Sequence, residues 1–81
     1  MTRQERIEDE NKKMRKLRRI VDLTSGLLYQ LPLTEESALS LIETVRKSAL
    51  ILFPGREDQF DLIYRPRFYR ILRERHILNV N

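Results

Sequence analysis

The apolar positions of the first thirty residues follow the spacing of a helix. They recur every three or four residues, with polar interruptions at Glu10 and Thr24. The stripe consists of Ile7, Met14, Leu17, Val21, Leu28 and Leu31. Because no proline precedes Pro32, the pattern predicts one helix over about residues 2–31. We expect it to continue through Gly26, although glycine costs about 1 kcal/mol relative to alanine in a helix.

The same helix changes character along its length. From Ile20 onward Leu23 and Leu27 widen the apolar stripe, so the carboxyl half is expected to be deeply buried. The amino half presents only a narrow seam. The two halves are therefore expected to have different neighbours.

A second helix follows a clear start signal. Pro32 ends the first helix, and Thr34 is an N-cap residue followed by two acids in the first turn. The apolar face of the second helix consists of Ala38, Leu41, Ile42, Val45, Ala49 and Leu52. The segment Phe53-Pro54-Gly55 ends this helix, because a residue before proline avoids helical angles and glycine suits a turn.

The third helical segment is interrupted by Pro66. A proline inside a helix costs roughly 3 kcal/mol, so we predict a short helix over about residues 57–64 and a second helix to about residue 75. Residues 76–81 are predicted to be a flexible tail. No segment alternates as a strand does. The sequence thus predicts a single all-α domain over residues 1–81, resembling a three-helix bundle: a long first helix, an antiparallel second helix and a proline-broken third helix.

The predicted lengths of the first two helices differ. At about 1.5 Å per residue the first is about 45 Å long and the second about 27 Å. Residues 1–13 therefore form an overhanging arm, and three outcomes are open for it: pairing with a second chain, binding another partner, or fraying. We expect pairing in a homodimer, because so small a domain without disulfides or metal is marginally stable alone. The predicted seam consists of Ile7, Met14, Leu17 and Val21.

The residue inventory disfavours catalysis. The 81 residues include no cysteine, one histidine and two glycines, which excludes a thiolate or multi-histidine metal site and a glycine-rich phosphate loop. Acids occur in pairs at residues 35–36 and 57–58, where the helix dipole explains them. His76 is interpreted as a surface residue in a basic tail. We expect no enzyme and no cofactor.

Membrane insertion is also not expected. No apolar stretch approaches the roughly 20 residues that a spanning helix needs, and the first residues lack the apolar core of a signal peptide. The expected location is the cytoplasm.

The net charge of +4 resolves into two basic clusters. Residues 12–19 contain six bases and no acid, and residues 65–75 contain five arginines and one acid. The candidates for contact with an acidic protein or a nucleic acid are Arg15, Arg18, Arg19, Arg67, Arg70 and Arg73. Arginine beside aromatic residues is typical both of single-strand nucleic-acid binders and of protein interfaces. A solvated charged face is the simpler explanation of either cluster.

These patterns favour a small non-catalytic module that assembles with itself and acts as a protein–protein interaction or adaptor protein. The alternative is a nucleic-acid-associated regulatory protein that uses its basic helix faces. An anionic membrane surface is a weaker alternative, because the acids at residues 8–10 dilute the charge of the first helix.

Overall fold

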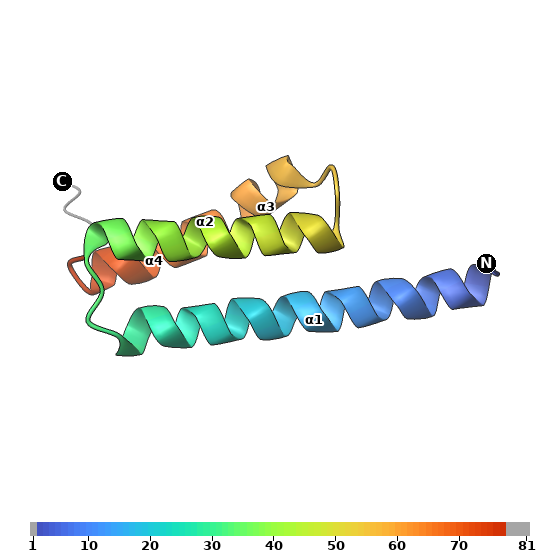
Figure 1. Cartoon of the computed structure of the whole chain (residues 1–81), viewed down its shortest axis with the longest axis horizontal. Helices are drawn as coiled ribbons and strands as arrows, with labels where there is room; N and C mark the ends of the chain where they lie inside the picture. Colours follow the sequence, from blue (N-terminus) through green and yellow to red (C-terminus); the bar gives the residue numbers. More distant parts are fainter. Residues whose placement is uncertain (1, 78–81) are drawn as a thin grey trace.

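The computed structural model describes residues 2–77, which form four helices and no strand. The helices are α1 (Arg3–Gln30), α2 (Glu35–Leu52), α3 (Glu57–Ile63) and α4 (Arg65–Glu74). Helices α1 and α2 run antiparallel, and α3 and α4 lead the chain back along them (Figure 1). The predicted all-α fold is confirmed, with α1 continuous through Gly26.

The helix boundaries follow local signals in the sequence. The Thr34 hydroxyl accepts a hydrogen bond from the Ser37 amide at 3.1 Å and so caps α2. Gly55 has a φ of +78°, which glycine adopts without strain, in the turn between α2 and α3. Pro66 lies in the first turn of α4, where its missing amide proton leaves no helical hydrogen bond unmade. The predicted break at the proline is therefore present.

The core lies between α1, α2 and α4, with Phe60 contributed by α3. Its largest fully buried side chains are Phe68, Leu28, Ile42 and Leu72. Thr24 is the one buried polar residue among those described, and its hydroxyl donates to the Ile20 carbonyl at 2.6 Å. This polar interruption of the apolar stripe is thus satisfied within its own helix.

The carboxyl half of α1 is less buried than its apolar residues predict. Leu23 is 66% exposed and Leu31 is exposed as well. The expectation of deep burial is wrong for these two side chains, because α2 and α4 cover only one side of α1.

Polar contacts join the helices at both ends of the body. The Arg75 guanidinium donates to the carbonyls of Leu28 and Leu31, the latter at 2.7 Å, and so joins the end of α4 to the end of α1. At the other end, Arg46 of α2 donates two hydrogen bonds, of 2.8 and 3.1 Å, to the Asp61 carboxylate of α3. The three short connections are thus supplemented by contacts between residues distant in sequence.

The end of α4 has the hydrogen bonds of a Schellman motif. The His76 amide donates to the Arg73 carbonyl at 3.1 Å, and the Ile77 amide donates to the Leu72 carbonyl at 2.8 Å. His76 has a φ of 57°, and Ile77 packs against the core. The predicted tail begins at these two residues, and its remainder, 78–81, lies outside the described residues.

The molecule is elongated, at 50 × 23 × 16 Å. Its radius of gyration is 14.5 Å, whereas a compact domain of this length would have about 12 Å. The difference comes from α1, whose amino-terminal turns extend beyond the end of α2 (Figure 1). Among the described residues, no helix has both the length and the apolar character needed to cross a bilayer.

Candidate interaction surface

The amino-terminal part of α1, residues 3–13, is called the arm below. Thr2 and Glu5 form a capping box at its start: the Thr2 hydroxyl accepts from the Glu5 amide at 3.2 Å, and the Glu5 carboxylate accepts from the Thr2 amide at 3.3 Å. Lys13 and Asp9 form an ion pair at 3.3 Å along the same helix. The arm is therefore a capped, regular helix. The Thr-x-x-Glu spacing that marks its start is visible in the sequence.

Two apolar side chains of the arm region face solvent. Ile7 is 49% exposed and Met14 is 38% exposed. They are seven residues apart, so they lie on the same face of α1, two turns from each other. Of the predicted seam, only these two residues are exposed.

The other two seam residues belong to the core. Leu17 is 5% exposed and Val21 is 8% exposed, and both pack within the chain. The apolar stripe of α1 is thus divided between two environments. Its carboxyl part packs within the body, and its amino part extends beyond the end of α2 (Figure 1).

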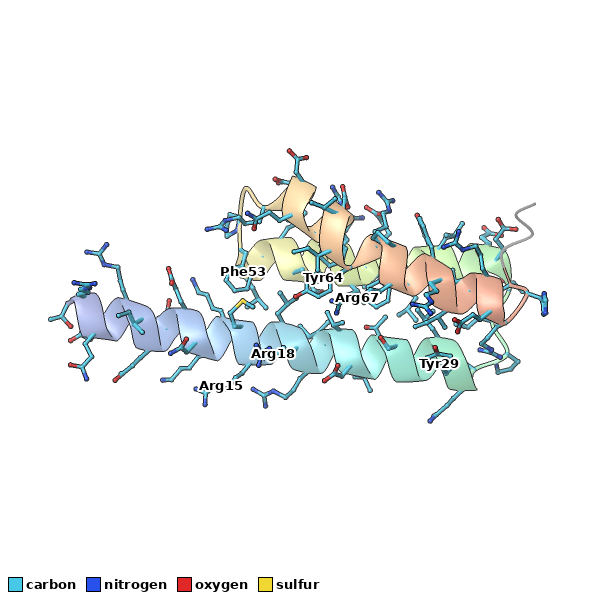
Figure 2. The ribbon with its side chains drawn as sticks, turned by 180° about the vertical axis from the view of Figure 1, so that it is seen from behind. Arg15, Arg18, Tyr29, Phe53, Tyr64 and Arg67 are labelled. Carbon is cyan, nitrogen blue, oxygen red and sulfur yellow. The ribbon has the colours of Figure 1, made fainter. Side chains whose placement is uncertain are left out.

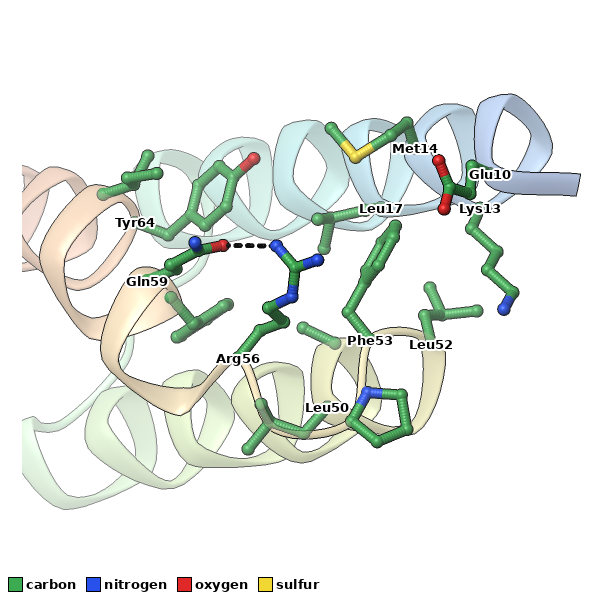
Figure 3. Close-up of a pocket in the computed structure, with 14 residues that line it drawn as sticks. Glu10, Lys13, Met14, Leu17, Leu50, Leu52, Phe53, Arg56, Gln59 and Tyr64 are labelled. Atoms are coloured by element: carbon green, nitrogen blue, oxygen red, sulfur yellow. Dashed lines mark hydrogen bonds between the residues drawn. The ribbon is translucent and has the colours of Figure 1, made fainter. Parts of the chain in front are cut away.

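An apolar groove of about 420 Å³ adjoins the base of the arm (Figure 3). It lies between α1, the end of α2 and α3, and Met14, Leu17, Leu52, Phe53 and Tyr64 are among its lining residues. On its α3 side, Arg56 donates a hydrogen bond to the Gln59 side chain at 3.0 Å. Sequence reasoning missed this groove, because it treated Phe53 only as the end of a helix.

The basic cluster of α1 forms an uninterrupted exposed surface. Arg15, Arg18 and Arg19 are all exposed, and together with Lys12 they alone line a crevice on the surface of α1. Among the ion pairs of the described residues, only the one between Lys13 and Asp9 involves residues 12–19. We call Lys12, Arg15, Arg18 and Arg19 the basic face of α1 (Figure 2 shows Arg15 and Arg18).

The arginines of α4 divide into two groups. The exposed residues Arg67, Arg70 and Arg73 are the predicted contact candidates. Arg70 is ion-paired with Glu74 at 3.2 Å, and the Arg67 guanidinium lies 5.8 Å from the centre of the Tyr64 ring. Arg70 and Arg67 are therefore already in contact with other groups of the chain.

The two remaining arginines of this cluster serve the fold. Arg65 contacts Asp61 at 3.6 Å and Glu43 at 3.7 Å and donates to the Tyr69 hydroxyl at 3.0 Å. Arg75 donates to carbonyls at the end of α1. The two clusters thus differ within residues 2–77: in that of α1 only Lys13 is ion-paired, whereas in that of α4 Arg65, Arg70 and Arg75 are bound to other groups of the chain.

The single histidine and the acids do not form a metal-binding group in the described part of the chain. His76 is exposed at the end of α4. Residues 2–77 contain no group of three or more histidines or acids placed to hold a metal ion. The features that stand out are therefore the arm, the groove and the basic face.

The chain has no detectable match to a protein-family model, to a curated protein or to a solved structure.

Proposed function

We propose that this chain is a non-catalytic helical interaction module that associates with a second copy through the arm and serves as an adaptor. The observation that carries this proposal is the arm itself. It is a capped helix that extends beyond the body, and Ile7 in the arm and Met14 next to it are exposed on one face of α1.

Helix physics supports a packing partner for the arm. Isolated helical segments of only a few turns are marginally stable in water, and most helices in proteins are stabilised by packing of an apolar face. Burial of one large apolar side chain contributes about 1.5–3 kcal/mol. Ile7 and Met14, together with the groove beside Phe53, supply such a surface.

Sedimentation equilibrium of matched variants tests the proposal. We expect the wild-type chain to form dimers at micromolar concentration and Ile7→Lys to be monomeric. Leu23→Lys is the control, because Leu23 is an exposed apolar residue of α1 outside the arm. A wild-type chain that remains monomeric at several hundred micromolar would contradict the proposal, as would a dimer lost in Leu23→Lys and kept in Ile7→Lys.

A second candidate function is the binding of a nucleic acid by the basic face of α1. The specific observation is that four bases line one surface crevice with no acid among them. Such a surface binds phosphates through counterion release, so its affinity falls steeply with salt.

Fluorescence anisotropy with a labelled single-stranded oligonucleotide measures this activity. We expect the double variant Arg15→Gln, Arg19→Gln to bind more weakly and to reduce the slope of log K against log salt by about 1.4. Arg70→Gln is the control, because Arg70 is already paired with Glu74. Absence of binding at low salt would exclude this function, and retained binding to an acidic polypeptide would assign the face to a protein partner.

A further inference from the structure

We propose that two copies pair through their arms in antiparallel orientation, an inference that rests on the proposed self-association. The supporting observation is the charge polarity of α1. Residues 3–10 contain four acids and two bases, whereas residues 12–19 contain six bases and no acid. Of these charged side chains, all are exposed except those of Asp9 and Lys13, which are half-buried.

The apolar residues alone do not select an orientation. In a parallel pair, Ile7 meets Ile7 and Met14 meets Met14 of the partner subunit. In an antiparallel pair, Ile7 of each copy lies level with Met14 of the partner subunit, and the two-fold symmetry makes this contact twice. Both arrangements bury the same four side chains, so another interaction must decide.

Electrostatics decides in favour of the antiparallel pair. Packed helices have axes 8–10 Å apart, which is about one Debye length at physiological salt. A parallel pair therefore holds acidic segments against each other and basic segments against each other. An antiparallel pair places the net negative residues 3–10 of each copy beside the net positive residues 12–19 of the partner subunit.

The register that pairs Ile7 with Met14 also aligns individual charges. It brings Glu8 level with Lys13 of the partner subunit and Glu5 level with Lys16 of the partner subunit. In the same register, Ile7 of the partner subunit lies beside Met14, which lines the apolar groove. The arm of one copy thus lies next to the groove of the other.

Cysteine cross-linking tests the orientation directly. The chain contains no cysteine, so each introduced thiol is unique, and the positions Gln4, Asn11 and Arg18 are all exposed on α1. A disulfide requires Cα atoms within about 7 Å. The three single variants are oxidised alone and in mixtures, after circular dichroism has verified that each remains helical.

The antiparallel pair predicts a specific set of products. Asn11→Cys cross-links with itself, because residue 11 lies next to the centre of the pair. A mixture of Gln4→Cys and Arg18→Cys gives a mixed disulfide dimer. Gln4→Cys alone does not cross-link, because its two thiols are about 20 Å apart along the helix axes.

The other outcomes separate the orientation from the self-association. Self-cross-linking of Gln4→Cys without the mixed product shows a parallel pair and overturns this inference, while the proposed self-association stands. If sedimentation shows a dimer but none of these disulfides forms, the register that pairs Ile7 with Met14 is wrong. A monomer without any disulfide overturns both the inference and the proposed function.

Discussion

The two glycines of the chain have different backbone conformations: Gly26 is helical, and Gly55 is left-handed. Gly26 lies inside α1, and a Cβ added there would meet no atom within 4 Å. We expect Gly26→Ala to raise the free energy of unfolding by about 1 kcal/mol, because alanine loses less backbone entropy in a helix. Gly55 has a φ of +78°, so Gly55→Ala should lower that free energy by about 1 kcal/mol. Urea unfolding followed by circular dichroism measures both changes, and equal signs for the two variants would contradict the assignment of Gly26 to a continuous helix.

Arg75 illustrates how one side chain can join two helix ends. Its guanidinium donates to the carbonyl of Leu28, which has no helical amide partner because residue 32 is a proline, and to the carbonyl of Leu31, which also accepts from the Leu33 amide. Arg75→Ala should lower the free energy of unfolding by about 1–2 kcal/mol, since hydrogen bonds from a charged donor are lost. Arg73→Ala is the matched control, because Arg73 is exposed on the same helix. Equal effects of the two substitutions in urea unfolding would argue against the capping role.

At the scale of the elements, the ion pair between α2 and α3 makes stability depend on pH. Hydrogen bonds from Arg46 lower the pKa of Asp61, and the positive charges of Arg46 and Arg65 act in the same direction. Because the folded state then binds the Asp61 proton less tightly than the unfolded state, the pair stabilises the fold above the usual carboxyl pKa of about 4. Its contribution is lost as the pH falls through the lower pKa of the folded state.

Asp61→Asn should therefore be less stable than wild type at pH 7, with a gap that stays constant down to about pH 5 and narrows below about pH 4. Urea midpoints measured at intervals across this range give the gap. Asp22→Asn serves as the control, because Asp22 is exposed on α1 and forms none of the ion pairs of the described residues. A gap that does not change with pH would show that Asp61 acts through packing alone.

The helices themselves were predictable because their ends are marked by local chemistry. Thr34 caps α2, Gly55 follows its end, and Pro66 marks the start of α4. Each signal involves only a few neighbouring residues, so it can be recognised in the sequence alone. The division of α1 into a buried part and an exposed arm also follows from the unequal helix lengths.

The contacts between residues distant in sequence, and with them the candidate interaction surface, were less predictable. Arg75 lies 44 residues from Leu31, whose carbonyl it contacts, so its role cannot be recognised from its sequence neighbours. Likewise, Leu17 and Met14 belong to the same apolar stripe, and only the position of the end of α2 decides that Leu17 is buried and Met14 exposed. The spacing of the apolar residues predicted the stripe on α1, but it did not predict which other helices would cover each part of it.

At the scale of the whole molecule, one part of α1 packs in the body and the other, the arm, extends beyond it. No residue of the arm is fully buried, and the first buried residue within the described range, 2–77, is Leu17. The fold should therefore not depend on the arm, whereas the proposed assembly depends on it entirely. Thermal unfolding over a range of protein concentrations distinguishes these two contributions.

A dimer that unfolds to separate chains is stabilised by mass action, so its Tm rises with concentration. A hundredfold increase in protein concentration stabilises the dimer by about 2.7 kcal/mol, or somewhat more than about 1 kcal/mol per chain. Because about 1 kcal/mol corresponds to about 4–8 °C in a domain of this size, we expect the wild-type Tm to rise by at least about 4 °C. A chain that begins at Asn11 should stay helical and should have a Tm independent of concentration. If this shortened chain is unfolded, the arm supports the body directly. If it keeps the concentration dependence, the copies associate through a surface other than the arm. Because arm and body share one continuous helix, the wild-type and shortened chains must be compared to separate the contribution of the arm to assembly from its contribution to the fold.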